Sequence, residues 1–228
     1  VNFLAIVTPS GRLDGVAVSL LRLGVDNIPF TSLPDPSSPP GPDNRPLVTE
    51  NVSSSDYALY LSGGKHVRER IDLGASIKAI YRTVDSFSAY GLGLDLGVCY
   101  EFAPGVRLAA NLRDVTTTPI VWNTETVDHI QPSLNLGVAW ARQLAGGQTT
   151  LLVGSRTGGD AEDHAGTTPV SAGFEYNRGN ISLRAGFEEG RGTFGLGLRP
   201  RRSLSLDVAY LQHDDLESTY LLSADLGF

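Results

Sequence analysis

The chain of 228 residues carries a formal net charge of -7, with 41% hydrophobic residues, 26 glycines and 13 prolines. The acidic balance argues against a nucleic-acid partner, which needs a basic surface to neutralise phosphates, and the glycines and prolines disfavour a helical bundle. The single cysteine, Cys99, excludes an internal disulfide. Because no apolar run reaches the roughly 18 residues of a transmembrane helix, a membrane-spanning form of this chain would be a closed β-barrel.

Apolar residues alternate with polar or small residues along most of the chain, and this period of two is typical of a strand with one apolar face. Each alternating segment is about as long as a tilted barrel strand, roughly 9 to 11 residues. The sequence therefore predicts an all-β fold, an antiparallel up-and-down transmembrane β-barrel that forms a single domain over residues 1–228 and shows about 13 strands. In chain order the predicted strands cover residues 1–7, 15–27, 56–63, 71–82, 89–102, 106–112, 130–142, 148–157, 170–176, 181–187, 194–198, 204–210 and 220–228.

The segment 89–102 has the clearest alternation. Its even positions run from Tyr90 to Phe102 and are all apolar, whereas its odd positions include Gly93, Asp95 and Glu101. A slip of one residue would place both carboxylates in lipid, where a charge near the midplane costs up to roughly 2–4 kcal/mol for Arg or Lys and less for acids. The alternation therefore assigns one face of this strand to lipid.

The predicted connections alternate between long and short, as expected for outer loops and periplasmic turns of an outer-membrane barrel. Counted back from a periplasmic C-terminus, the outer loops are 28–53, 83–88, 114–129, 158–169, 189–192 and 212–218. The periplasmic turns are 8–14, 64–70, 103–105, 143–147, 178–180 and 200–203. Proline cannot donate to a β-ladder, so the Pro-rich segment 28–53 is predicted to be an extracellular loop throughout. It could bind a partner or be a disordered excursion.

The C-terminal segment keeps its alternation to the last residue, and Tyr220 and Phe228 lie on its apolar side. An end on Phe resembles the terminal signal that the barrel-assembly machinery recognises, so these two residues are the candidate assembly signal. Bacterial single-chain barrels have an even number of strands, and an odd count leaves unpaired backbone groups at an open edge. Since the chain starts at Val1 and contains no Met, we expect at least one N-terminal strand and an export signal to lie outside it.

Charged residues in register with the glycines rather than with the apolar positions are predicted to face a lumen. They could tune the selectivity of a pathway, but the mixed signs and the many inward glycines favour ion pairs across a narrow lumen. These residues are Arg22, Lys78, Arg82, Asp95, Glu101, Arg107, Arg113, Arg156, Glu175, Arg184, Arg199 and Asp207.

The sequence predicts no catalytic, cofactor or metal site, and no arrangement of Ser, His and acid supports a hydrolase. The glycines of 91–97 have the spacing of a nucleotide-binding turn, but they lie inside a strand with no helix after it. The acidic residues Asp160, Glu162 and Asp163 could bind a divalent cation, although a solvated acidic loop is the favoured interpretation. The histidines fall in predicted turns or loops without metal-ligand spacing: His66, His129, His164 and His213.

Two stretches resemble the PorV/PorQ family of outer-membrane barrels. The first is Ser19–Pro29 (SLLRLGVDNIP), which is followed by a long loop and by Asp56–Ser62 (DYALYLS). The second is Leu94–Gly97 (LDLG), which leads through Phe102 and Pro104 into Leu108 and Asn111. The resemblance implies a fold similar to the long-chain fatty-acid transporter barrel of about 14 strands and a link to type IX secretion. The N-terminal segment that can occupy the lumen in that family has no counterpart here.

Three hypotheses for function follow. The leading one is a non-enzymatic barrel of the bacterial outer membrane that serves protein export or surface attachment, with lipid, the barrel-assembly machinery and secretion-system proteins or cargo as partners. The second is passage of small hydrophobic molecules, which an apolar pocket opening between strands would favour. The third is a soluble β-sandwich that acts as a binding module.

Overall fold

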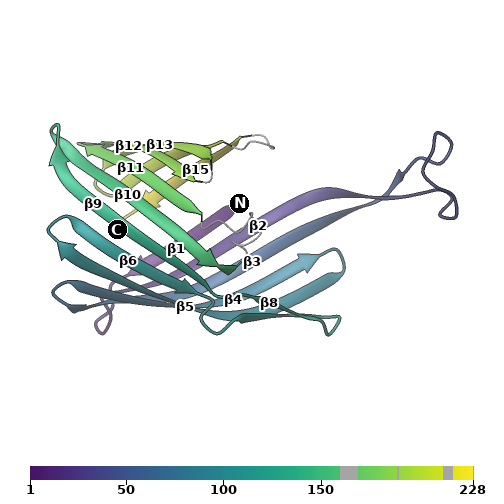
Figure 1. The fold of residues 1–228 in the computed structure, drawn as a ribbon, viewed down its shortest axis with the longest axis horizontal. Coiled ribbons are helices and arrows are strands. Elements are labelled where there is room, and N and C mark those ends of the chain that lie inside the picture. Colours follow the sequence, from purple (N-terminus) through teal and green to yellow (C-terminus); the bar gives the residue numbers. More distant parts are fainter. Residues whose placement is uncertain (160–168, 189, 213–217, 228) are drawn as a thin grey trace. The chain divides into compact units, whose positions relative to one another are not determined.

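The computed structural model describes residues 1–159, 169–188, 190–212 and 218–227. Phe228 lies outside the described residues, as do Asp160, Glu162, Asp163, His164 and His213. Over the described part the chain forms one antiparallel sheet of 15 strands (Figure 1). The strands are β1 (Asn2–Thr8), β2 (Gly15–Ser32), β3 (Leu47–Arg68), β4 (Ile71–Val84), β5 (Phe87–Ala103), β6 (Val106–Arg113), β7 (Thr118–Trp122), β8 (Val127–Ile130), β9 (Ser133–Leu144), β10 (Gly147–Gly158), β11 (Val170–Arg178), β12 (Ile181–Glu188), β13 (Arg191–Arg201), β14 (Leu204–Leu211) and β15 (Thr219–Leu226).

The strands pair with their neighbours in chain order, β1 to β6 and then β9 to β15, while β7 and β8 branch from β5. All the strands of the main path correspond to predicted strands, so the prediction of an all-β antiparallel fold is confirmed. Short turns join them where they were predicted: Ala103 ends β5 and Val106 begins β6, with Gly105 at φ +80°. Glycine adopts this left-handed conformation without the penalty that a Cβ would bring.

Several predicted connections are wrong in part. β3 continues to Arg68 through most of the predicted turn 64–70, and only 85–86 of the predicted loop 83–88 lie between β4 and β5. The Pro-rich loop 28–53 loses both its ends to strands, because β2 continues to Ser32 and β3 begins at Leu47, with Pro29 opposite Asn51. Figure 1 shows the two strands continuing together as a long ribbon. The predicted loop 114–129 holds the β7–β8 hairpin, since β7 pairs with the part of β5 that β6 does not reach.

The chain divides into two compact units. The first comprises Val1–Lys65, Gly74–Asp95 and Asp114–Gln131. In this unit one face of the sheet carries Leu59, Leu61, Ile77 and Leu92, and we call it the apolar face. The opposite, polar face carries Ser62 and Ser76, whose hydroxyl oxygens lie 2.7 Å apart, and also Lys78.

The second unit comprises His66–Leu73, Leu96–Arg113 and Pro132–Phe228. Its strands keep the same alternation, because residues directly opposite in an antiparallel pair point to the same side. Val138 faces Val153 and Leu196 faces Val208 on the apolar face. Glu175 faces Arg184 on the polar face.

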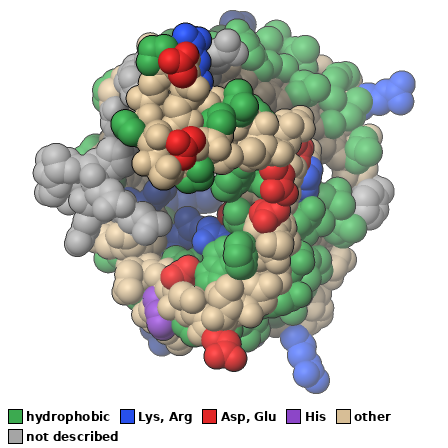
Figure 2. Space-filling view, turned by 90° about the vertical axis from the view of Figure 1, so that its right-hand side faces the viewer, with side chains coloured by type: hydrophobic (Ala, Val, Ile, Leu, Met, Phe, Trp, Pro, Cys, Tyr) green, Lys and Arg blue, Asp and Glu red, His purple; other side chains and the backbone are tan. Residues whose placement is uncertain are grey.

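The apolar face is exposed in both units. Exposed fractions include 55% for Leu61 and 63% for Leu92 in the first unit, and 55% for Val153 and 61% for Phe194 in the second. Hydrophobic side chains cover much of the surface seen in Figure 2. Among the described residues only Val52, Ala89 and Ile120 form a buried apolar core, and no helix there is long and apolar enough to cross a membrane.

Candidate functional site

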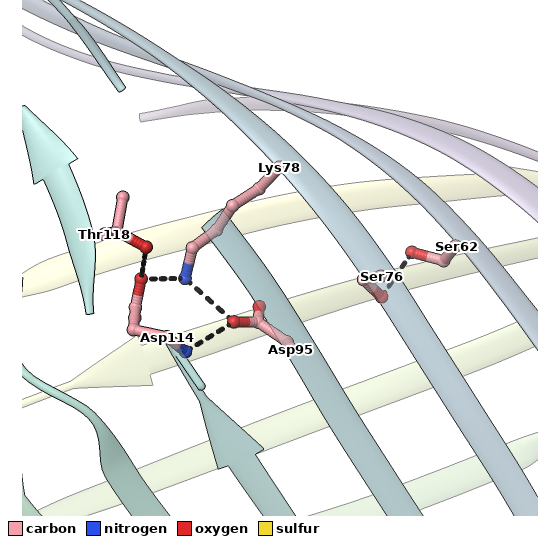
Figure 3. Close-up of polar contacts among 6 residues, drawn as sticks. All are labelled: Ser62, Ser76, Lys78, Asp95, Asp114 and Thr118. Atoms are coloured by element: carbon pink, nitrogen blue, oxygen red, sulfur yellow. Dashed lines mark hydrogen bonds and ion pairs between the residues drawn. The ribbon is translucent and has the colours of Figure 1, made fainter. Parts of the chain in front are cut away.

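A buried ion cluster on the polar face of the first unit connects three elements (Figure 3). Lys78 of β4 places its Nζ 2.9 Å from Asp95 Oδ1 of β5 and 2.7 Å from Asp114 Oδ1, which lies just after β6. The side chain of Lys78 is only 3% exposed, that of Asp95 13% and that of Asp114 5%. One cation thus lies between two carboxylates in a place that water scarcely reaches.

Two further donors complete this cluster. The backbone N–H of Asp114 donates to Asp95 Oδ1 at 2.8 Å, and the hydroxyl of Thr118 donates to Asp114 Oδ1 at 2.5 Å. A buried ion pair is tolerated only when hydrogen bonds satisfy its remaining lone pairs and protons. The cluster therefore depends on the backbone at Asp114 and on the start of β7, and it ties the segment after β6 to the sheet.

The segment from Asp114 to the β7–β8 hairpin is fixed by its backbone as well. Asp114 and Thr117 have positive φ angles of 53° and 57°, and the Thr117 N–H donates to the Asp114 carbonyl at 2.8 Å. A β-branched residue rarely adopts this conformation, so surrounding contacts must impose it. Val115 adds a hydrogen bond from its N–H to the Leu94 carbonyl at 2.9 Å.

Two glycines of β5 make room for the hairpin. A Cβ at Gly93 would lie 2.6 Å from Lys78 Cε and would collide with Thr118 Oγ1. A Cβ at Gly91 would lie 2.9 Å from the Pro119 carbonyl oxygen and would collide with Ile120. Ile120 and Thr118 are both completely buried. The hairpin thus packs against backbone, which fixes it closely to the polar face of β5.

A second cluster, also with one cation between two carboxylates, lies on the polar face of the second unit. Arg184 of β12 places Nε 2.6 Å from Glu175 Oε2 of β11, and its Nη1 pairs with Asp207 of β14. Asn177 donates to Glu175 at 2.6 Å and Ser205 donates to Asp207 at 3.1 Å. The side chain of Arg184 is 40% exposed, that of Glu175 30% and that of Asp207 21%. This cluster bridges strands but remains accessible to water.

The other predicted lumen-facing charges are distributed along the polar face. Arg82 pairs with Asp56 at 3.2 Å, Glu101 lies directly opposite Arg107, and Arg156 donates to Asn135 at 3.0 Å. Arg113 ends β6 opposite Ser133, and Arg199 lies at the register shift of β13 between Leu198 and Arg201. That this face lines a lumen stays a prediction.

Arg22 does not share a face with the other charges that were predicted to line a lumen. Arg22 lies directly opposite Tyr57, and two residues along, Leu20 lies opposite Leu59, so Arg22 belongs to the apolar face. The segment 15–27 misled the prediction because apolar residues occupy both of its faces, with Leu21 and Leu23 on the other side. The role of this arginine therefore differs from that of the ion clusters.

The candidate assembly signal is described only at Tyr220, which lies opposite Tyr210 with ring centroids 5.4 Å apart. No group of His, Cys, Asp and Glu that could hold a metal ion occurs within the part of the chain that the structure describes. His66, which was predicted to lie in a turn, is part of β3 and places Nδ1 2.6 Å from Asp72 Oδ1.

The tip of the β2–β3 ribbon has a hydrogen-bonded structure. The Asn44 amide donates to the carbonyls of Asp35 and Ser38 at 2.9 and 3.0 Å, and the hydroxyls of Ser37 and Ser38 donate to the Asp35 carboxylate at 2.6 and 2.7 Å. The hydrogen bonds from the Ser37 and Ser38 hydroxyls stabilise the ionised carboxylate and hold the pKa of Asp35 below its ordinary value. The contacts disfavour the alternative of a disordered excursion for residues 33–46.

Sequence reasoning missed Asp114 and Thr118. Both follow the predicted strand 106–112 inside a presumed loop, so their charge and hydroxyl carried no face assignment. One signal was present: Thr118, Ile120 and Trp122 alternate with Pro119 and Val121, which is the period of a short strand.

Fold and site together define a chain with one antiparallel sheet, an exposed apolar face, and a charged face that carries a fixed hairpin. No family model and no curated protein matches it. Two mutants of the Rh. blastica porin are similar solved structures, with 9% and 10% sequence identity and TM-scores of 0.39 and 0.38. Each alignment covers 92% of this chain and 100% of the porin chain. A likeness of fold at this level does not assign a function.

Proposed function

We propose that this chain is a β-barrel of the bacterial outer membrane whose apolar face contacts lipid. The observation that carries the proposal is the exposure of the apolar face in both units beside a polar face that holds the ion clusters. Moving apolar surface from water into lipid is favourable by about 25 cal/mol for each Å² of apolar area covered. An apolar face left in water would lack this stabilisation. Antiparallel strands also satisfy each other's backbone groups, as lipid requires of any closed barrel.

The test is extraction and heat-modifiable migration. The membrane fraction of expressing cells is extracted with detergent, and boiled and unboiled samples are compared by gel electrophoresis. A barrel that resists the detergent gives two positions, and boiling converts one to the other. A protein that remains in solution without detergent and migrates at one position would contradict the proposal and favour the soluble sandwich.

Within this proposal we assign the barrel a PorV/PorQ-type role in protein export or surface attachment. The support comes from the β2–β3 ribbon, where Phe30, Leu47 and Val48 are 52%, 58% and 59% exposed. Polar side chains such as Glu50, opposite Phe30, accompany them. Exposed apolar groups rimmed by polar side chains mark surfaces that bind protein or membrane, and on this ribbon we assign them to a protein partner.

Substitution of the ribbon tests this role. The variant Phe30→Ser with Leu47→Ser and Val48→Ser should reduce the amount of protein that the native host secretes or attaches to its surface. A matched variant, Thr31→Ala with Glu50→Gln, changes polar side chains of the same ribbon and should not. Unchanged secretion in the first variant, together with binding of long-chain fatty acid by the purified barrel, would favour the competing proposal of transport of small hydrophobic molecules.

A further inference from the structure

A row of tyrosines marks one limit of the apolar face in the first unit. Tyr57, Tyr81 and Tyr90 lie on β3, β4 and β5, with ring centroids 6.2 Å apart for the first pair and 4.8 Å for the second. Toward one side the same face continues with apolar residues, for example Leu59 and Leu92. On the other side of the tyrosine row, two residues along each strand, the same face carries hydroxyl groups instead, those of Ser55, Thr83 and Ser88. Tyrosines concentrate at such boundaries because the ring prefers the apolar side and the hydroxyl prefers water.

Arg22 lies in this row. Its Nε donates to Tyr57 Oη at 3.2 Å, its Nη2 donates to Ser55 Oγ at 3.3 Å, and its Cζ lies 5.8 Å from the centre of the Tyr57 ring. The guanidinium extends over Gly24, where a Cβ would lie 3.1 Å from Nη2. It therefore points along the strand away from Leu20 and toward the hydroxyl side of the tyrosine row.

The described residues give the Arg22 guanidinium hydroxyl partners and no carboxylate partner. Lys78, Arg82 and Arg184 each have a carboxylate within 4 Å, whereas no carboxylate of the described residues lies that close to Arg22. On a lipid-facing surface an arginine costs roughly 2–4 kcal/mol at the midplane but only about 0–1 kcal/mol near the interface. At the membrane interface the charged groups of the lipid include headgroup phosphates. Arginine binds phosphate through paired N–H donors.

We propose that Arg22 and Tyr57, with Ser55 and Gly24, form a binding site for the phosphate of an anionic lipid headgroup on the outside of the barrel. Nε and one donor of Nη2 are occupied by the protein, and these contacts orient the remaining guanidinium donors. Tyr57, Tyr81 and Tyr90 offer ring faces and hydroxyls to the part of the headgroup next to the acyl chains. The site rests on the proposed membrane location.

Lipid retention measured by native mass spectrometry tests the site. The detergent-solubilised barrel is incubated with diphosphoryl lipid A, with phosphatidylglycerol or with phosphatidylcholine, and bound lipid is counted for the wild type and for Arg22→Gln. The wild type should retain the two anionic lipids, and the variant should lose about tenfold in apparent affinity, the loss of one charge-assisted group. Arg45→Gln, which removes the same charge at the tip of the ribbon, should retain lipid as the wild type does.

Two further arms decide the chemistry. Arg22→Lys keeps the charge but loses the planar fork, so its affinity should fall between those of the wild type and Arg22→Gln. Inorganic phosphate should not displace the bound lipid at equal concentration, because the acyl chains contribute to binding. Displacement by phosphate would overturn the lipid assignment, and equal retention by Arg22→Gln and the wild type would overturn the site.

Failure of this inference is distinguishable from failure of the proposed function. A chain that shows no heat-modifiable migration in detergent is not a membrane barrel, and both proposals fall. A chain that is heat-modifiable both as wild type and as Arg22→Gln, but binds all three lipids equally, is a barrel without this site.

Discussion

The two units of this molecule use the same three charges in different surroundings. In each, one cation lies between two carboxylates that come from other elements, Lys78 in the first unit and Arg184 in the second. The side chain of Lys78 is 3% exposed and that of Arg184 is 40% exposed. A buried charge cannot exchange its partner for water, so its removal leaves the partners stranded, whereas a half-exposed cluster is relieved by solvent.

The difference indicates different roles. The Lys78 cluster includes Asp114, which begins the segment that carries the β7–β8 hairpin, so it determines where that hairpin lies. The Arg184 cluster connects β11, β12 and β14, which the ladders β11–β12, β12–β13 and β13–β14 already join. We therefore expect substitutions in the first cluster to move an element and those in the second to change stability slightly.

The largest expected effect is that of Lys78→Met. It leaves Asp95 and Asp114 buried without a cation, which costs about 3–5 kcal/mol, and it should release the hairpin. The measurement is urea unfolding of the barrel in detergent micelles, followed by fluorescence in a Trp140→Phe background, where Trp122 of β7 is the only tryptophan. Its emission should shift to the red before the global transition.

The control for this experiment is the triple change Lys78→Met, Asp95→Asn and Asp114→Asn, which removes all three charges. Neutral side chains of similar size should recover much of the loss, because the cost comes from unpaired buried charge rather than from the missing pair. Equal loss in the single and triple variants would contradict the electrostatic explanation and indicate that packing at Lys78 dominates.

The glycines next to the two cations extend the comparison to steric effects. Gly93→Ala brings a Cβ within 2.6 Å of Lys78 Cε, so we expect a loss of about 1–3 kcal/mol from forced movement of the hairpin. Gly195, directly opposite Arg184, leaves a Cβ 3.4 Å from Arg184 Cβ, so Gly195→Ala should change the free energy of unfolding little. Thermal unfolding of both variants, with chymotrypsin cleavage near Trp122 as a local readout, checks this.

The hydroxyl donors give a smaller contrast. Thr118 donates to the buried Asp114 carboxylate, and Ser205 donates to Asp207, which is 21% exposed. Thr118→Val should lower stability by about 1–3 kcal/mol, because the buried Asp114 carboxylate loses one hydrogen bond to a charged group and keeps only Lys78 on Oδ1. Ser205→Ala should have a much smaller effect, since water can replace the hydroxyl. Similar losses in the two variants would mean that burial does not separate the clusters.

The sequence predicted the strands and most of the faces because the signal was long and the penalty for a slip was large. In the segment 89–102, Asp95 and Glu101 exclude one register outright. Arg22 was misplaced because Leu20, Leu21 and Leu23 put apolar groups on both faces of its strand, so alternation alone could not choose between them. Its neighbours on β3 decide, and they are set by pairing across the sheet.

The hairpin was missed for a different physical reason. β7 and β8 are short, and strands of this length gain stability only from a partner edge and a place to bury side chains. Both come from tertiary structure: the free edge of β5 at Ala89–Gly91 and the space above Gly91 and Gly93. Consequently the predicted charge set contained Lys78 and Asp95 but omitted Asp114, which completes the cluster.

The smallest expected effect concerns Arg184 and its response to salt. Arg184→Met removes two ion pairs from a cluster that solvent reaches, so the loss should be about 1 kcal/mol or less at low ionic strength. Since the Debye length falls from about 10 Å at 0.1 M to about 3 Å at 1 M salt, this loss should shrink further in concentrated sodium chloride. The loss caused by Lys78→Met should persist, because the low-dielectric surroundings of Lys78 admit few ions. Urea titrations of both variants at the two salt concentrations measure this, and an equal salt dependence would show that the two clusters are solvated alike.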